Sequence, residues 1–277
     1  MKRTYILILF LSVLFIKSYA LDLNKIAEEL EHEGKTLYKH EMASWHGTDL
    51  FLEHYSKTEN IGGYFSYIHE DSIKNVFFSR EENPLTLGII TFDSTFAINK
   101  ATIEMKSRDF SEQEKLLYDL RLKALKEIHT DTIFKYYDNT SLNIIPLIYK
   151  GEKKVYILTG PKVNGVIIFG NDYLLTFDEN NNLKTKQVLH KNIIPIGYGG
   201  NKEEESVLTM HSHLPETGDF ITPTDICTLM LYSGRAGWEE HYVTSENYTS
   251  IWDCRKNTLT IVNKPLSKYL EEKPKNE

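Results

Sequence analysis

Residues 207–213, VLTMHSH, and residues 222–225, TPTD, decide the expected fold of the second half of this chain. The first segment alternates between apolar and polar positions, which predicts a strand that carries His211 and His213 on one face. The backbones of the two histidines would then lie about 7 Å apart, a spacing that suits two ligands of one metal ion.

The TPTD segment predicts the start of a helix. Thr222 is a natural N-cap, Pro223 suits the first helical position, and Asp225 falls at the third. Two interpretations stay open for Asp225. It closes a capping box with Thr222, or its carboxylate points back towards the histidines as a third metal ligand. In the second case water would fill the fourth position of an open zinc site.

Further segments of the second half are predicted as strands, because they are short, apolar or β-branched, and bounded by turn residues. These strands are residues 154–158, 163–169, 173–177, 241–245, 249–254 and 259–262, of which 241–245 and 249–254 form a hairpin. The helix that starts at Pro223 is expected to reach about Tyr232.

The first half is expected to mix helices and strands. A helix is predicted from Leu23 to about Met42, with Gly34 interrupting its apolar spacing. Residues 61–69, 75–79 and 85–92 are predicted as strands. A capping-box pattern at 111–114 opens a second helix. The apolar face of that helix consists of Leu117, Leu120, Ala124 and Ile128.

These patterns predict an α+β fold. Residues 21–145 form a mixed α+β region, and residues 146–265 form a mixed β-sheet flanked by helices. Residues 266–277 are charged and contain a proline, so a disordered tail is expected there.

Residues 1–20 have the features of a secretory signal peptide. Lys2 and Arg3 precede an apolar run that is too short for a comfortable membrane span, and residues 18–20, SYA, form an acceptable cleavage site. The mature chain is therefore expected to be exported, to the periplasm or the extracellular space. No later segment is apolar enough to cross a membrane.

The net charge of the chain limits the classes of molecule that it is expected to bind. The net charge of −7 becomes more negative still once the signal and its basic residues are removed. An acidic chain without a basic stripe argues against nucleic acid as a partner. The sequence does not set the oligomeric state.

Cys227 and Cys254 are the only cysteines. In an exported protein they could form one disulfide, or remain as two buried free thiols. A second histidine group, His40-Glu41 with His46, lacks the spacing of a zincin motif and is interpreted as a surface patch.

The segments His211-Ser212-His213-Leu214-Pro215 and Thr222-Pro223-Thr224-Asp225 resemble the metal signature of the JAMM (MPN) metalloprotease-like superfamily. That signature is His-x-His, commonly followed by proline, and then Ser-x-x-Asp at the start of a helix. The resemblance implies that His211, His213 and Asp225 bind zinc, and that Thr222 stands where the family has its serine, which helps to hold the reacting group.

The catalytic base of the family is harder to place. Members carry a glutamate on an early strand, commonly as Glu-x-x-Gly, and the best match here is Lys162-Val163-Asn164-Gly165. A lysine cation cannot accept a proton from zinc-bound water. Glu203, Glu204 and Glu205 lie near the histidines in the sequence and are interpreted as a solvated acidic loop.

Two functions follow from the sequence. The first is an exported zinc-dependent hydrolase of the JAMM type, acting on peptide or isopeptide bonds in a peptide or protein substrate, with its base not identified. The second is a non-catalytic exported binding protein with a JAMM-like fold and a degenerate site.

Overall fold

The computed structural model describes residues 21–199, 208–263, 265, 266 and 268. The predicted signal at 1–20 and the acidic residues Glu203, Glu204 and Glu205 lie outside the described residues, as does nearly all of the predicted tail at 266–277. Helices and several sheets alternate along the chain, which confirms the α+β class.

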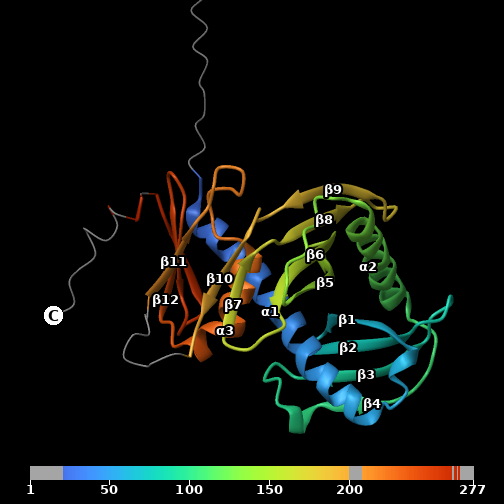
Figure 1. Cartoon of the computed structure of the whole chain (residues 1–277). Coiled ribbons are helices and arrows are strands. Elements are labelled where there is room, and N and C mark those ends of the chain that lie inside the picture. The colour runs from blue at the N-terminus through green and yellow to red at the C-terminus, as the bar shows by residue number, and fades with distance from the viewer. Residues whose placement is uncertain (1–20, 200–207, 264, 267, 269–277) are drawn as a thin grey trace, which may run out of the picture.

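A long helix, α1 (Leu23–His54), runs through the middle of the molecule and packs against sheets on both sides of it (Figure 1). It continues well past the predicted end at Met42. Gly34 does not interrupt it but lies where α1 packs closely against helix α3. A Cβ atom at position 34 would lie 2.5 Å from Cβ of Ile226, so only glycine fits.

The first sheet has the order β1-β2-β3-β4 and is antiparallel throughout. Its strands are β1 (Ile61–His69), β2 (Ser72–Ser79), β3 (Thr86–Phe92) and β4 (Thr102–Glu104). Two single-turn 3-10 helices, η1 (Thr58–Asn60) and η2 (Ile98–Lys100), lie beside it in the chain. The second half of α1 packs on this sheet around Phe51 and Phe77, whose rings stack 3.9 Å apart.

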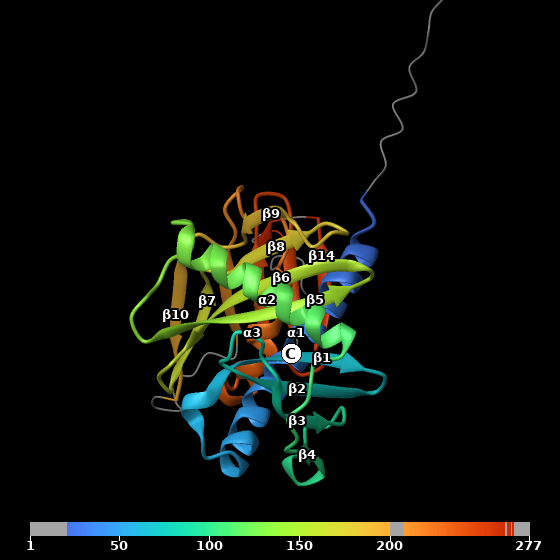
Figure 2. The same cartoon turned by 90° about the vertical axis from the view of Figure 1, so that its right-hand side faces the viewer.

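The second sheet has the order β5-β6-β8-β9 and lies beneath helix α2 (Glu112–Thr130), as Figure 2 shows. Its strands are β5 (Thr140–Tyr149), β6 (Glu152–Pro161), β8 (Tyr173–Phe177) and β9 (Leu183–Val188). The predicted capping box between Ser111 and Glu114 is present. The predicted helical face is buried, with Leu120, Ala124 and Ile128 against the sheet and Leu117 in the neighbouring cluster.

The remaining strands form the part of the molecule that carries the two histidines. Strands β7 (Val166–Gly170) and β10 (Ile193–Gly197) form an antiparallel pair. The last sheet has the order β11-β12-β13-β14. Its strands are β11 (Leu208–Ser212), β12 (Glu240–Thr244), β13 (Thr249–Asp253) and β14 (Thr258–Val262). β11 and β12 are parallel, joined by the crossover helix α3 (Pro223–Ala236).

The predicted boundary between residues 145 and 146 falls inside β5, which pairs with β6 along its whole length. Helix α1, placed by the prediction in the first region, also packs against α3 and β14 of the second.

The two cysteines are free thiols, so the considered disulfide is not formed. Cys227 is buried in a cluster with Leu37 of α1, whereas Cys254 packs against a different cluster that contains Trp238 and Trp252. Among the described residues, no helix combines the length and the apolar character that a membrane span requires.

The interpretation of His40 and Glu41 as a surface patch was wrong. His40 is only 2% exposed, and Glu41 is half-buried and lines a cavity. Burial of His40 follows from the position of α1, which has sheets on more than one side and therefore no wide solvent face at this point.

Candidate metal centre

His211 lies in β11 and His213 directly follows that strand. Both side chains turn inwards, as the alternation of the sequence predicts, and each residue is only 7% exposed. The parallel pairing with β12 continues beyond the strand, because His213 N donates to Thr244 O over 2.8 Å. The two Nε2 atoms lie 3.1 Å apart.

Asp225 has the geometry that each of the two interpretations of the sequence requires. It closes a capping box with Thr222, and it also faces the histidines from the first turn of α3. Oδ2 of Asp225 accepts hydrogen bonds from Thr222 N over 2.9 Å and from Thr222 Oγ1 over 2.8 Å. The same carboxylate lies 3.4 Å from Nε2 of His213 and 3.7 Å from Nε2 of His211. The cap therefore fixes a carboxylate that is aimed at the pair of imidazoles.

A third histidine, His190, completes the group and was missed by the sequence analysis. It lies between β9 and β10, and its Nε2 is 3.1 Å from Nε2 of His213 and 3.4 Å from Oδ2 of Asp225. No motif contains it, and its approach to β11 depends on the packing of separate sheets. A lone histidine after a strand carries no signal of its own.

The four side chains form one compact, buried cluster. His190, His211, His213 and Asp225 each offer one ligand atom, and these atoms all lie within 4.8 Å of one another. Such a group of imidazole nitrogens and a carboxylate oxygen could hold a metal ion. It is the one group of this kind found among the described residues.

Neighbouring side chains orient the histidines from behind. Nδ1 of His211 lies 2.9 Å from Nε2 of His241, and Nδ1 of His241 lies 2.7 Å from Thr209 Oγ1. If the protons of this chain run from His211 to His241 to Thr209, Nε2 of His211 keeps a lone pair for a metal. Partners of this kind behind a metal-bound imidazole fix its tautomer and its ring orientation.

Asp172 takes the corresponding place behind His190. Its Oδ2 lies 3.6 Å from Nδ1 of His190, while its Oδ1 accepts a hydrogen bond from Thr159 N over 2.9 Å. The backbone of the same aspartate accepts from Leu189 N over 2.8 Å. Asp172 therefore holds the loop that carries His190, and its carboxylate faces the ring of that histidine.

The charges suit a cation. Burial acts to raise the pKa of Asp225, but the surrounding histidines outweigh it and hold that pKa well below its usual value. Burial lowers the pKa of His211 to about 4 and that of His241 to about 3, so both rings are neutral at pH 7. For His190, burial opposes protonation, but the carboxylates of Asp225 and Asp172 raise its pKa to about 10. At pH 7 the metal-free cluster therefore holds a protonated His190 between the carboxylates of Asp225 and Asp172, and a bound metal ion would replace that positive charge.

Several polar atoms of the cluster are buried without a hydrogen-bond partner in the described structure. These are Nδ1 of His190, Nδ1 of His213 and Oδ1 of Asp225. A buried acceptor such as this carboxylate oxygen costs free energy unless it is paired or bound to an ion. Oδ1 of Asp225 lies 3.7 Å from Nε2 of His211 and has no hydrogen-bond partner among the described residues, so it is available to a metal ion.

Two further residues were singled out by the sequence, Thr222 and Lys162, and neither is among the four clustered side chains. The hydroxyl of Thr222 is engaged with Asp225 and Thr224, so it orients a ligand. Lys162 is exposed in the turn before β7, whereas Phe169 at the other end of that strand has its ring 5.2 Å from that of His211. The position proposed for the base therefore lies at the far end of β7 from the cluster.

Comparison with known proteins adds no relative. No family model, curated protein or solved structure matches this chain. The resemblance to the JAMM superfamily therefore stays a prediction from the short metal signature.

Proposed function

We propose that this chain is a zinc-binding protein that holds one ion with His190, His211, His213 and Asp225. The observation that carries the proposal is the spacing of the ligand atoms. Tetrahedral zinc with bonds of about 2.0–2.1 Å requires ligand atoms about 3.3 Å apart. Five separations within the cluster are 3.1, 3.1, 3.4, 3.4 and 3.7 Å, of which the two of 3.4 Å involve Oδ2 of Asp225 and the last involves Oδ1, and all four ligand atoms lie within 4.8 Å of one another.

The donor atoms support zinc among the common metals. Calcium and magnesium prefer oxygen ligands, and this cluster offers three imidazole nitrogens. Cys227, two residues after Asp225 in the same helix, is buried in a separate apolar cluster and adds no thiolate. Imidazole with one carboxylate is a common ligand set for zinc, and copper or nickel would compete for it in the test tube.

The number of protein ligands supports a structural rather than a catalytic ion. Catalytic zinc sites usually have three protein ligands and a water molecule, whereas structural sites have four protein ligands. His190 stands where the three-ligand interpretation of the sequence placed water. Bound zinc would join the loop before β10, strand β11 and the first turn of α3.

The second candidate is a hydrolase of the JAMM type, favoured by the match of His211, His213 and Asp225 to that signature. It requires His190 to leave the ion so that water can bind, and it requires a carboxylate base. Asp172 is the described carboxylate behind the cluster, but it faces His190 and is fixed by Thr159 N. A peptide or isopeptide substrate and an exported location belong to the same sequence-based hypothesis.

Metal analysis and cobalt substitution test the proposal. We expect the purified protein to contain one zinc per chain, and His213→Ala to contain none. Cobalt in place of zinc should give the intense visible absorption of a tetrahedral ion. Azide should leave that spectrum unchanged in the wild type and shift it in His190→Ala, where a position for solvent opens. An azide shift in the wild type would instead support the hydrolase, and absence of stoichiometric metal would overturn both candidates.

A further inference from the structure

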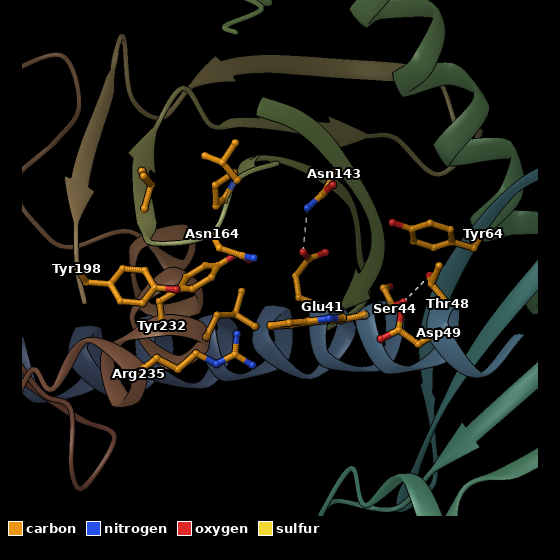
Figure 3. Close-up of a pocket in the computed structure, with 15 residues that line it drawn as sticks. Glu41, Ser44, Thr48, Asp49, Tyr64, Asn143, Asn164, Tyr198, Tyr232 and Arg235 are labelled. Carbon is orange, nitrogen blue, oxygen red and sulfur yellow. Dashed lines mark hydrogen bonds between the residues drawn. The ribbon is translucent and has the colours of Figure 1, made fainter. Parts of the chain in front are cut away.

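A second site lies apart from the metal centre, in a cavity of about 390 Å³ between α1, the ends of β5–β7 and the last turns of α3 (Figure 3). Asp225 occupies the first turn of α3, while Tyr232 and Arg235 line the cavity seven and ten residues later. At a rise of about 1.5 Å per residue, the two sites are about 10–15 Å apart along the helix. The cavity is therefore independent of the proposed metal ion.

Glu41 and Asn143 meet at the centre of this cavity (Figure 3). Nδ2 of Asn143 donates to Oε2 of Glu41 over 3.0 Å, and no hydrogen bond within the described structure is recorded for the other carboxylate oxygen. Gly160, in the neighbouring strand, leaves room for this amide, because a Cβ atom there would lie 3.2 Å from Nδ2 of Asn143. The pair is thus held in place, with acceptor atoms left for a ligand.

Tyrosines surround this pair. Figure 3 shows Tyr198 and Tyr232 on one side of the cavity and Tyr64 on the other, with their hydroxyl groups directed inwards. A tyrosine offers an apolar ring together with a group that both donates and accepts hydrogen bonds. Asn164 adds another amide to the lining. The wall therefore alternates aromatic surface with polar groups of both kinds.

The charges of the cavity argue against an anion and against a simple cation. Asp49 repels an anionic ligand, and Arg235 is engaged with Trp45, its guanidinium lying 4.5 Å from the ring centroid. Burial raises the pKa of Glu41 to about 7, so its carboxyl group is partly protonated at neutral pH and is a weak counter-ion for a cation. A neutral ligand with many hydroxyl groups is not repelled by Asp49 and does not need a counter-ion.

We infer that this cavity binds a neutral carbohydrate of one or two rings, with Glu41, Asn143 and Tyr232 as its main hydrogen-bonding residues. A sugar has hydroxyl groups that both donate and accept, and an apolar face of C–H groups that packs on aromatic rings. Glu41 and Asn143 would bind hydroxyl groups at the centre, and the tyrosines would enclose the ring. The volume lies within the range of small-ligand sites, about 300–1,000 Å³.

Ligand-observed NMR and calorimetry on the full chain test the inference. The probes are glucose, N-acetylglucosamine, maltose and cellobiose, with choline and inorganic phosphate as charged counterparts. We expect at least one of the saccharides to bind with 1:1 stoichiometry. Tyr232→Phe, which removes one hydroxyl group, and Asn143→Ala should each weaken that binding by about tenfold, the effect of one lost hydrogen bond.

A control variant separates this result from other causes. Asn60→Ala changes an exposed asparagine outside the cavity and should leave the affinity unchanged. The two proposals depend on different residues, so either can fail without the other. Binding of choline or phosphate in place of a saccharide would overturn the inference. So would the absence of any binding, or a saccharide affinity that survives both cavity variants in folded protein.

Discussion

The hydroxyl group of Thr222 donates to Oδ2 of Asp225 over 2.8 Å, so the residue that caps α3 also fixes the carboxylate that faces three histidines. Capping and orientation of the carboxylate are thereby served by one hydroxyl group, because Thr222 Oγ1 also accepts the cap hydrogen bond from Asp225 N over 3.1 Å. This explains why a common helix-start pattern and a metal signature can coincide in four residues without conflict.

The variant Thr222→Ala removes both the cap and the orienting hydrogen bond, and two measurements distinguish the effects. Loss of the cap should lower the free energy of unfolding of the metal-free protein by about 1 kcal/mol. Loss of the orienting hydrogen bond should weaken zinc binding by about tenfold to a hundredfold. Urea unfolding in EDTA measures the first effect, and competition with a zinc-chelating dye measures the second. Thr222→Ser keeps the hydroxyl group and should retain most of both, whereas equal losses in the two variants would contradict this explanation.

Removal of the metal should destabilise the folded protein. A ligand that binds only the native state adds about 1.4 kcal/mol to stability for each tenfold rise in its free concentration above Kd. We therefore expect the melting temperature to rise with buffered free zinc in the wild type and much less in His190→Ala. His69→Ala, at an exposed histidine of β1, is the matched control and should follow the wild type. A wild-type melting temperature independent of zinc would exclude a structural ion.

The buried His40 should make the protein sensitive to acid. Burial lowers its folded-state pKa from 6.5 to about 4, so the unfolded chain binds the proton more readily. The contribution of His40 to stability is present above pH 6.5 and is lost as the pH falls towards 4. In His40→Gln, the fall in unfolding free energy over this window should be smaller than in the wild type. Urea unfolding at several pH values, in EDTA, gives the comparison, and an unchanged slope would refute it.

Gly34 should tolerate no larger residue, because α1 and α3 meet there. Gly34→Ala places a Cβ atom 2.5 Å from Cβ and Cγ2 of Ile226, and we expect a loss of about 1–3 kcal/mol in the free energy of unfolding. Gly234→Ala is the matched helical control. Nothing lies within 4 Å of its added Cβ, so it should be neutral or stabilising by up to about 1 kcal/mol. If Gly34→Ala changed the free energy of unfolding no more than Gly234→Ala does, the close packing of α1 on α3 would not require glycine at position 34.

Local patterns in the sequence predicted local structure well. The bounds predicted for β1 and β8 are those of the structure, and the two capping boxes, at Ser111 and Thr222, are present. These features depend on residues close in the sequence, on strand alternation and on side chains that bond their own backbone. The same reasoning placed His211, His213 and Asp225 on adjacent faces, and the structure brings them together.

Features that depend on distant contacts were not predicted. The prediction ended helix α1 near Met42, twelve residues too early. The side of α1 that is buried changes as the helix passes from α3 to the first sheet, so no single apolar periodicity runs along its whole length. His190 reaches the cluster only through the packing of the loop before β10 against β11. His40 is buried because sheets surround α1 at that point. None of these contacts has a signature within its own segment.

The spread of the four ligands along the chain also has a consequence for biosynthesis. His190 and Asp225 belong to segments separated by β10 and β11, so the loop before β10 and the first turn of α3 must both be in place before the four side chains meet. A nascent chain that has emerged only as far as His213 has three of the ligands but not the carboxylate that fixes them. A metal ion held by all four side chains would therefore report that these separate segments have come together.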